Sequence, residues 1–352
     1  MPHRTDDLRI DELRPLIPPA ILMEELPLSE QGATLVWESR REISRVLSGE
    51  DDRLLVVVGP CSVHDPEAAL EYARRLAAVS ERFREDLLLV MRVYFEKPRT
   101  TVGWKGLIND PHLDGSFVIN EGLRRARKFL LDVIDLGLPA GSEFLDPISP
   151  QFIADLVSWG AIGARTSESQ VHRELASGLS MPVGFKNGTN GTVQLAIDAI
   201  RSAAHPHHFL SVTKQGVAAI VSTRGNDECH VILRGGTSGP NYSAEHVAQV
   251  VADLESAGLP GRLMIDCSHA NSGKNHEFQP EVVADVANRI RGGDTTIFGL
   301  MLESFLVDGN QNHESGEPLV YGQSITDKCM GWERTEPLFA ELADAVRKRR
   351  NS

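Results

Sequence analysis

One pattern recurs along the sequence: a short apolar segment leads directly into a residue that can bind anions or metal ions. The segments lead into Cys61, Arg92, Glu143, Arg165, Lys186, Arg234, His269 and Glu303. Arginine matches carboxylate and phosphate oxygens with a planar fork, and lysine acts as a point charge. Thiolate, imidazole and carboxylate groups together suit a first-row dication such as Mn, Fe, Co or Zn. The pattern therefore indicates a site for a phosphorylated anionic substrate and a divalent metal.

Each of these residues also has a structural alternative. A lone cysteine such as Cys61 is more often a small buried hydrophobic residue. The four cations could be paired with Glu143 or other acids, because burying an unpaired charge is costly. Four cations at equivalent positions are harder to explain by salt bridges alone. A further carboxylate lies in the polar turn Ser-Ile-Thr-Asp327, and the metal interpretation then has four candidate ligands: Cys61, His269, Glu303 and Asp327.

These residues need parallel strands to bring them together. Parallel strands buried on both faces have continuous apolar sequences, and a (β/α)8 barrel gathers the C-terminal ends of its strands at one face, where its active site lies. Amphipathic helical patterns alternate with the apolar runs, at residues 66–79, 121–136, 151–159, 193–204, 244–257 and 280–290. This alternation predicts an α/β fold of the TIM-barrel class.

Nine candidate strands are one too many for the barrel. The run 208–213 is followed, across a short connection that contains Gly216, by a second extended run at 217–223, which is a hairpin signal. We therefore predict an inserted antiparallel hairpin at 208–223, before barrel strand six, with a regulatory or subunit-contact role. Residues 1–50 are predicted to form an N-terminal arm, with helical spacing at 33–47 and a break at Pro18-Pro19. Residues 51–352 are predicted to form the catalytic barrel.

Composition narrows the class of protein. The 352 residues carry a formal charge of −13, which argues against nucleic-acid or anionic-membrane binding. Apolar stretches are too short for a membrane span, and the first residues lack the apolar core of a secretory signal. We expect a cytoplasmic protein. Its four cysteines are too few and too dispersed for a disulfide scaffold.

Several long segments resemble, in order, those of the type I, feedback-regulated 3-deoxy-D-arabino-heptulosonate 7-phosphate (DAHP) synthases. They are Gly-Pro-Cys61-Ser, Arg92-Val-Tyr-Phe-Glu-Lys97-Pro-Arg99-Thr-Thr, Gly-Trp-Lys-Gly, Ile-Gly-Ala-Arg165-Thr, Gly-Phe-Lys186-Asn-Gly, Leu-Arg234-Gly-Gly and Asp-Cys-Ser-His269-Ala-Asn. The resemblance implies condensation of phosphoenolpyruvate with erythrose 4-phosphate, the first step of the shikimate pathway. It also implies a metal-dependent barrel that assembles as a homotetramer built from dimers.

The resemblance assigns roles to individual residues. It implies that phosphoenolpyruvate is held by Arg92, Lys97, Arg165, Lys186 and Arg234. Erythrose 4-phosphate is expected at Arg99, Thr100 and Asp327, and the metal at Cys61, His269, Glu303 and Asp327. The expected catalytic residues are Lys97, Lys186 and Glu143, and both Glu143 and Lys186 are candidates for handling the proton of the attacking water.

The resemblance also implies an effector pocket for an aromatic amino acid. The matching residues are Asp6, Asp7, Phe144, Pro150, Gln151, Ser180, Phe209, Ser211 and Val221. Ser211 stands where tyrosine-sensitive relatives often carry glycine, which favours phenylalanine as the inhibitor. Residues 180–184 and Pro147 look more like tyrosine-type members, so tyrosine is the next candidate.

Two alternatives compete with this interpretation. One is another condensation of phosphoenolpyruvate with an aldose, such as 3-deoxy-octulosonate 8-phosphate or sialic acid synthesis, and Lys97-Pro98-Arg99-Thr100 argues against it. The other is a catalytically silent amino-acid sensor, against which the presence of Cys61 and His269 argues. Whether Cys61 forms a disulfide with Cys329 on oxidation stays open at this point.

Overall fold

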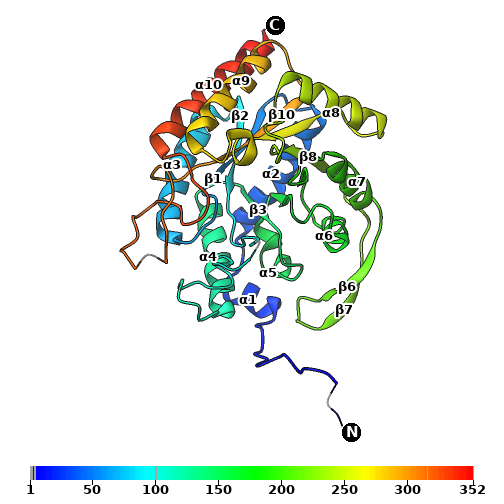
Figure 1. Cartoon of the computed structure of the whole chain (residues 1–352), viewed down its shortest axis with the longest axis vertical. Helices are drawn as coiled ribbons and strands as arrows, with labels where there is room; N and C mark the ends of the chain where they lie inside the picture. Colours follow the sequence, from blue (N-terminus) through cyan, green and yellow to red (C-terminus); the bar gives the residue numbers. More distant parts are fainter. Residues whose placement is uncertain (1–2, 4, 100, 315, 352) are drawn as a thin grey trace.

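Eight parallel strands close into a barrel in the order β1-β10-β9-β8-β5-β4-β3-β2 (Figure 1). The computed structural model describes residues 3, 5–99, 101–314 and 316–351. The barrel strands are β1 (Leu54–Gly59), β2 (Leu87–Arg92), β3 (Ala140–Glu143), β4 (Trp159–Ile162), β5 (Val183–Lys186), β8 (Cys229–Leu233), β9 (Leu263–Asp266) and β10 (Ile297–Glu303). The first and last strands pair, with Gly59 opposite Glu303. The predicted α/β barrel is therefore confirmed.

Side chains of the barrel strands are buried on both faces, as their apolar sequences require. Leu55, Val57 and Val90 point into the barrel, where they pack against Trp159 and Phe298. Their neighbours along β1 belong to the larger core between the strands and the surrounding helices. A packed interior of this kind is typical of TIM barrels and makes the strand ends a rigid platform.

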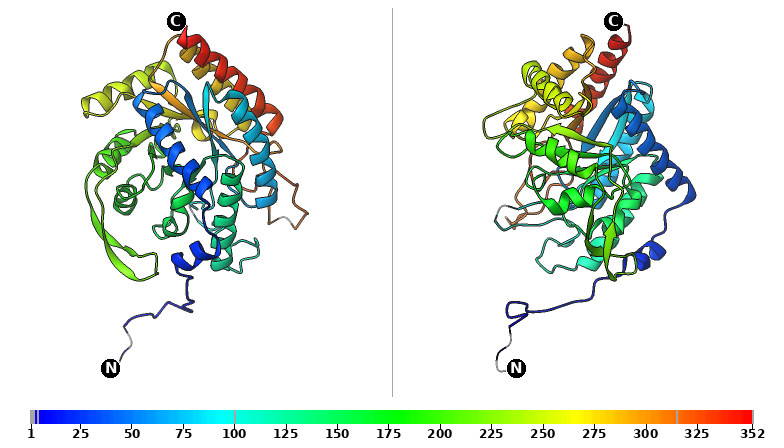
Figure 2. Two further views of the ribbon diagram at one scale, coloured as in Figure 1. Left: turned by 180° about the vertical axis from the view of Figure 1, so that it is seen from behind. Right: turned by 90° about the vertical axis from the view of Figure 1, so that its right-hand side faces the viewer.

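Helices surround the barrel on its outer side (Figures 1 and 2). They are α3 (Pro66–Phe83), α4 (Ile119–Asp135), α6 (Gln170–Ala176), α7 (Gln194–Ala203), α8 (Ala244–Ser256), α9 (Gln279–Arg291) and α10 (Trp332–Arg350). Helix α2 (Glu30–Ser48) instead lies across the N-terminal end of the barrel, where Ile43 and Val46 pack with side chains of the barrel interior. Helix α3 shows how the sequence sets a boundary: the Asp65 carboxylate accepts from the amides of Glu67 and Ala68, and Pro66 occupies the first turn.

The C-terminal helix α10 packs against α9 and α3. Arg347 and Arg350 of this helix both contact Asp86, which lies directly before β2 and is almost fully buried. The Arg350 Nη1 to Asp86 Oδ1 distance is 2.8 Å. A buried carboxylate with two guanidinium partners thus fastens the end of the chain to the N-terminal end of the barrel.

Three parts of the helix prediction differ from the structure. The helix expected at 151–159 is wrong beyond its first turn: α5 covers Pro150–Ile153, a 3-10 turn covers Ala154–Leu156, and β4 begins at Trp159. The break expected at Pro18-Pro19 is the start of helix α1 (Pro19–Glu25), because proline is well suited to the first helical turn. Helices α6 and α10 were not expected.

The predicted hairpin is present as a separate two-stranded sheet. It does not join the barrel, which therefore has eight strands, as expected. Its strands are β6 (His208–Val212) and β7 (Ala218–Ser222), and Phe209 pairs with Val221. The amide of Ala20 in α1 donates to the carbonyl of Lys214 at the hairpin tip over 2.7 Å. On the outer face, Leu210 is 87% and Ile220 76% exposed.

The first described residues of the arm extend away from the rest of the molecule (Figure 2), whereas the backbone of Pro15 and Ile17 hydrogen-bonds to the side chain of Asn120 in α4. Of the helices in the described ranges, none combines the length and the apolar character that crossing a bilayer demands.

Candidate functional site

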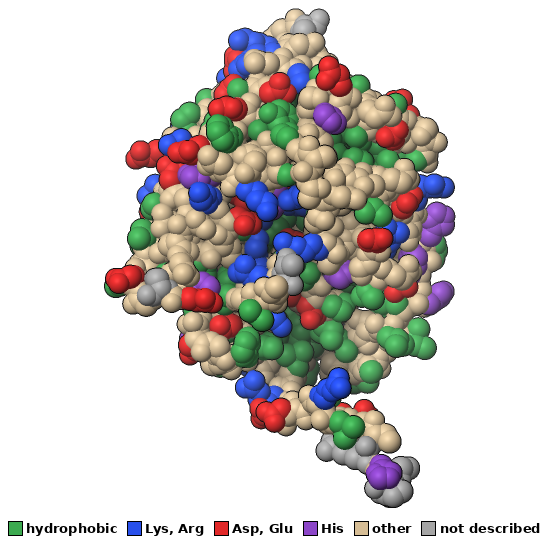
Figure 3. Space-filling view, viewed as in Figure 1, with side chains coloured by type: hydrophobic (Ala, Val, Ile, Leu, Met, Phe, Trp, Pro, Cys, Tyr) green, Lys and Arg blue, Asp and Glu red, His purple; other side chains and the backbone are tan. Residues whose placement is uncertain are grey.

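A cavity of about 360 Å³ opens where the barrel strands end, and lysine and arginine side chains surround it (Figure 3). Its lining includes the predicted residues Arg92, Lys97, Arg99, Glu143, Arg165, Lys186, Arg234, His269, Glu303 and Asp327. Cys61 is fully buried directly beside this lining. Thr100 lies outside the described residues. Groups that are dispersed along the sequence thus meet at one end of the barrel.

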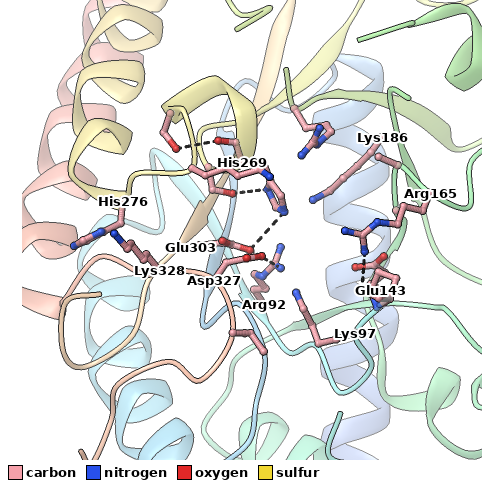
Figure 4. A pocket seen from close by; sticks show the side chains of 18 of the residues that line it. Arg92, Lys97, Glu143, Arg165, Lys186, His269, His276, Glu303, Asp327 and Lys328 are labelled. Atoms are coloured by element: carbon pink, nitrogen blue, oxygen red, sulfur yellow. Dashed lines mark hydrogen bonds and ion pairs between the residues drawn. The ribbon is translucent and has the colours of Figure 1, made fainter. Parts of the chain in front are cut away.

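A compact cluster of possible metal ligands is formed by Cys61, Glu303 and Asp327. One ligand atom from each lies within 4.8 Å of the others. His269 stands at the edge of this cluster, with its Nε2 3.9 Å from Oε1 of Glu303 (Figure 4). One sulfur, one imidazole nitrogen and two carboxylates form a donor set that fits a first-row divalent metal.

Two cations lie against the cluster. Lys97 Nζ is 3.0 Å from Cys61 Sγ, and Arg92 Nη2 is 2.9 Å from Glu303 Oε1. Burial and then the negative charge of Glu303 raise the pKa of Cys61 to about 12, and the positive charge of Lys97 opposes this shift. The Cys61 thiol donates to Oδ2 of Asp327 over 3.4 Å. Burial alone would raise the pKa of Asp327, but above all the positive charge of Lys97 lowers it to about 2.

Arg92 is held rigidly at the end of β2. Its guanidinium group donates to the carbonyls of Pro60 and Cys61 as well as to Glu303. It also lies over the ring of Tyr94, with Cζ 3.6 Å from the ring centroid, which is a cation–π arrangement. The side chain is only 1% exposed, so it belongs to the floor of the cavity.

Arg165 and Arg234 differ from Arg92 and Lys186 in their partners. Arg92 is paired with Glu303, and Lys186 with Asp266. Arg165 donates to the carbonyl of Pro98 over 2.6 Å, and Arg234 donates to the carbonyl of Gly235 over 3.3 Å. Among the residues that the structure describes, neither has a carboxylate partner within 4.0 Å. The salt-bridge alternative therefore accounts for Arg92 and Lys186, but leaves two arginines to attract an anion.

Glu143 ends β3 and faces the cavity beside Arg165 (Figure 4). Its position depends on Gly163, which follows β4. A Cβ atom on Gly163 would lie 2.1 Å from Oε1 of Glu143, so a larger residue there would displace the carboxylate. The sequence analysis did not single out this glycine, because nothing in a lone glycine shows which side chain it accommodates.

The sequence analysis also missed four titratable residues at the site. Lys274, His276 and Lys328 line the cavity; Lys274 and Lys328 lie in loops and His276 begins a short 3-10 helix, and no apolar run precedes any of them. Asp266 is the last residue of β9 and is fully buried between Lys186 and His269. The strand-end pattern could have found it, since it closes the segment that leads to His269.

The expected effector residues lie on several elements. Phe144 is buried directly after β3, Pro150 and Gln151 begin α5, and Ser180 lies in the turn before β5. Phe209, Ser211 and Val221 are half-buried on the hairpin. The Lys214 ammonium at the hairpin tip donates to the carbonyl of Gln151, which links the hairpin to α5. Asp6 and Asp7 belong to the N-terminal arm.

Glu96 is a buried acid next to the Lys97 loop. Its Oε2 accepts from the hydroxyl of Ser149 over 2.8 Å, and its residue is 5% exposed. Burial raises the pKa of Glu96 to about 8; the hydrogen bond from Ser149 opposes this shift, whereas the charge of Asp146 adds to it. The folded protein therefore keeps this carboxyl protonated at pH values where the unfolded chain has lost the proton.

We expect Glu96→Gln to stabilise the protein at alkaline pH. The favourable contribution of the protonated acid is complete below its unfolded pKa of about 4.5 and is lost as the pH rises through about 8. Glutamine stays neutral, so the melting temperature should rise by roughly 5 °C at about pH 9 and change little at about pH 5. Exposed Glu38→Gln is the control in thermal melts across this range. An equal change of melting temperature at every pH would contradict the expectation.

Comparison with known proteins gives consistent matches over nearly the whole chain. The model of the DAHP synthetase I family matches residues 26–340. The Phe-sensitive phospho-2-dehydro-3-deoxyheptonate aldolase of Escherichia coli (strain K12) is 63% identical over 99% of this chain and 100% of its own length. The tyrosine-inhibited enzyme of Schizosaccharomyces pombe is 56% identical over 99% of this chain and 94% of its own. A solved phospho-2-dehydro-3-deoxyheptonate aldolase from Francisella tularensis superposes with a TM-score of 0.95 at 55% identity, covering 97% of this chain and 99% of that structure.

Proposed function

Because the chain belongs to the DAHP synthetase I family, we propose that its barrel-end cavity joins phosphoenolpyruvate to erythrose 4-phosphate. With one water molecule the reaction gives DAHP and phosphate, and it is the first step of the shikimate pathway. One observation carries the proposal: a cluster of possible metal ligands lies at the same cavity as Arg165 and Arg234, for which the described residues supply no carboxylate partner.

In this proposal Cys61, His269, Glu303 and Asp327 hold a divalent metal, which is Mn, Co, Fe or Zn. The donor atoms of Cys61, Glu303 and Asp327 are already close together, and the Nε2 atom of His269 faces them. When bound, the metal supplies a Lewis acid for the aldehyde oxygen of the sugar phosphate.

The cations of the cavity bind and orient the first substrate. Phosphoenolpyruvate carries a phosphate and a carboxylate, and we assign them to Arg92, Lys97, Arg165, Lys186 and Arg234. Arg165 and Arg234 support this assignment because no described carboxylate neutralises them. Holding both reactants in one geometry offsets the entropy cost of a bimolecular step.

Erythrose 4-phosphate, the second substrate, is assigned to the rim of the cavity at Arg99. Arg99 is exposed at the cavity edge, and its Nε donates to the carbonyl of Trp104 over 2.7 Å, which leaves its terminal nitrogens for a phosphate. Asp327 lies beside the position where the aldehyde and neighbouring hydroxyls would sit. Thr100 is the third residue assigned to erythrose 4-phosphate.

Proton transfers are assigned to three side chains. C3 of phosphoenolpyruvate attacks the aldehyde carbon, a carbon–carbon bond forms, and the aldehyde oxygen takes a proton from the Lys97 ammonium. Water then adds at C2 and gives its proton to Glu143, with Lys186 as the second candidate. Phosphate leaves as the C2–O bond breaks, the hydroxyl proton that remains at C2 passes to the leaving phosphate, and C2 becomes the ketone carbon. Cations around the leaving phosphate stabilise its charge.

Product analysis tests the proposal. Phosphoenolpyruvate is supplied with either erythrose 4-phosphate or arabinose 5-phosphate, and both the sugar-acid product and the released phosphate are measured. We expect product with the tetrose and little with the pentose. Preference for the pentose would favour 3-deoxy-octulosonate 8-phosphate synthesis, and no turnover with either, despite binding of an aromatic amino acid, would favour a silent sensor.

We propose that an aromatic amino acid inhibits the enzyme by binding near the hairpin, with phenylalanine favoured and tyrosine next. Its pocket is assigned to Phe144, Pro150, Gln151, Ser180, Phe209, Ser211 and Val221, completed by Asp6 and Asp7 of the arm. The hairpin residues Phe209 and Ser211 are only half-buried, so an added ligand can still cover them.

We expect Ser211→Gly to change the choice of inhibitor without changing uninhibited turnover. Removing the side chain leaves room for a phenol hydroxyl, so the ratio of tyrosine to phenylalanine inhibition constants should fall by about 10-fold, equal to about 1.4 kcal/mol. Inhibition curves for all three aromatic amino acids measure this ratio. Ser222→Gly, an exposed position on the neighbouring strand, is the control, and an unchanged ratio in Ser211→Gly would place the pocket elsewhere.

The oligomeric state and the division of the chain complete the proposal. We assign residues 1–50 and 208–223 to regulation and subunit contacts, residues 51–352 to the catalytic barrel, and the assembly to a homotetramer of two dimers. The exposed apolar side chains Leu210 and Ile220 on the hairpin support a contact between subunits. Light scattering coupled to size-exclusion chromatography measures the state, and a monomer at micromolar concentration would contradict it.

A further inference from the structure

Asp266 lies between the proposed metal ligands and the proposed phosphoenolpyruvate ligands. It ends β9, where it pairs with Met301 of β10, and its side chain is fully buried. Its Oδ2 atom lies 2.8 Å from Nζ of Lys186 and 2.9 Å from Nδ1 of His269. Its Oδ1 atom accepts from both the amide and the hydroxyl of Ser268. One carboxylate therefore contacts a proposed phosphoenolpyruvate ligand and a proposed metal ligand at the same time.

The contact with His269 determines which ring nitrogen faces the metal site. A carboxylate next to Nδ1 favours a proton on that nitrogen, and in the neutral imidazole Nε2 then carries the lone pair. Nε2 is also the atom that faces Glu303, at 3.9 Å from its Oε1. Partners of this kind fix the orientation and tautomer of metal-binding histidines in many proteins.

The contact with Asp266 also holds the ammonium group of Lys186 in place. Lys186 is 4% exposed, and an ammonium group at that depth needs a counter-charge. Asp266 supplies the counter-charge and also defines the direction of the side chain. Figure 4 shows Lys186 and His269 approaching the cavity from neighbouring parts of its wall, with Arg165 beyond Lys186.

We propose that Asp266 is a positioning residue that prepares His269 for the metal and Lys186 for phosphoenolpyruvate, so that a single carboxylate couples the two halves of the site. The proposal depends on the proposed function, because it takes the roles of His269 and Lys186 from it. Asp266 itself does not touch the reacting atoms in this arrangement.

The test uses Asp266→Asn in the full-length protein, with Co²⁺ and phosphoenolpyruvate as separate probes. The asparagine amide can donate to Nδ1, which moves the histidine proton to Nε2 and removes the lone pair. Co²⁺ affinity, measured by competition with a chromophoric chelator, should fall by about 10- to 100-fold. Phosphoenolpyruvate affinity of the metal-free protein, measured by calorimetry, should fall by about 10-fold because Lys186 loses its fixed position.

A purely electrostatic role predicts the opposite change for the substrate. Removing a negative charge near a bound anion would strengthen phosphoenolpyruvate binding. Tighter or unchanged substrate binding in Asp266→Asn would therefore overturn the proposal, as would unchanged Co²⁺ affinity.

Asp86→Asn is the matched control. Asp86 is as deeply buried and also has two cationic partners, but it lies before β2 at the other end of the barrel. This variant should lower the melting temperature and leave both affinities within about 2-fold of the wild type. Loss of both affinities in the control would show that the effects report general destabilisation.

A second variant covers the case in which Asp266→Asn does not fold. Ser268→Ala keeps the charge of Asp266 but removes the hydroxyl that donates to its Oδ1 and that lies 2.8 Å from Nδ1 of His269. Both affinities should fall by about 3-fold, and the fall in phosphoenolpyruvate affinity is the change that reports on Asp266, because Ser268 contacts His269 directly. No change in either affinity would overturn the proposal. Product formation by the wild type separates this inference from the proposed function: an active wild type with unaffected variants rejects the role of Asp266 alone, whereas an inactive wild type rejects the function.

Discussion

Replacing Cys61 by serine should lower DAHP formation by at least about 1,000-fold while the barrel stays folded. The thiolate is the softest of the four proposed ligands, and a hydroxyl is a poor substitute for it. Loss of Lewis-acid stabilisation amounts to several kcal/mol, and each 1.36 kcal/mol corresponds to a factor of ten in rate. Initial rates at saturating substrates, with metal content determined on the same sample, measure the effect.

Cys229→Ser provides the control for this substitution. Cys229 is also buried, but it begins β8 and therefore lies at the opposite end of the barrel strands from the cavity. Its replacement should leave turnover and metal content within about 2-fold of the wild type. Full activity of Cys61→Ser in the presence of a chelator would reject the proposed metal site.

Arg165→Ala should raise the Michaelis constant for phosphoenolpyruvate by about 10- to 100-fold and that for erythrose 4-phosphate much less. A hydrogen bond to a charged group contributes about 1.5–3 kcal/mol, which corresponds to this range. Arg165 has no described carboxylate partner, so its removal leaves no orphaned acid to complicate the result. Steady-state kinetics with each substrate varied in turn measure the two constants.

The substitution Arg99→Ala is the counterpart of Arg165→Ala, because each variant is expected to affect mainly one of the two substrates. Arg99 lies at the exposed rim, and its loss should raise the constant for the tetrose more than that for phosphoenolpyruvate. The two variants then have opposite selectivity, which a general loss of stability does not produce. Equal effects of both substitutions on both substrates would reject the division of the cavity between the two anions.

The barrel was predictable because its strands are continuous apolar segments, which are typical of a parallel sheet buried on both faces. Every barrel strand is buried on both faces, and the excess strand resolves into a hairpin whose alternate residues are exposed. The errors occur where local signals are ambiguous. Proline is compatible both with a break and with the first turn of a helix, and Pro19 begins helix α1. Residues 150–158 contain a helical turn, but the helix stops before Trp159 enters the barrel interior. At both places, only packing against the rest of the chain determines whether the segment forms a helix.

The site was predictable in its residue types and less so in its contacts. Strand ends converge in a barrel, so Arg92, Lys186 and Glu303 were expected to meet. The sequence does not show that Arg92 pairs with Glu303 while Arg165 contacts only the carbonyl of Pro98. These differences depend on separations of a few ångströms between elements that are distant in sequence, and periodicity carries no information at that scale.

Pairing of β1 with β10 places Cys61 near the beginning of the chain opposite Glu303 and Asp327 near its end. A ribosome synthesising this protein therefore releases the thiol long before the two carboxylates exist. The nascent polypeptide cannot assemble the full set of proposed ligands during most of translation. Under the proposed metal site, metal acquisition would follow closure of the barrel, and a message truncated before codon 327 would yield a chain that lacks one of the proposed ligands.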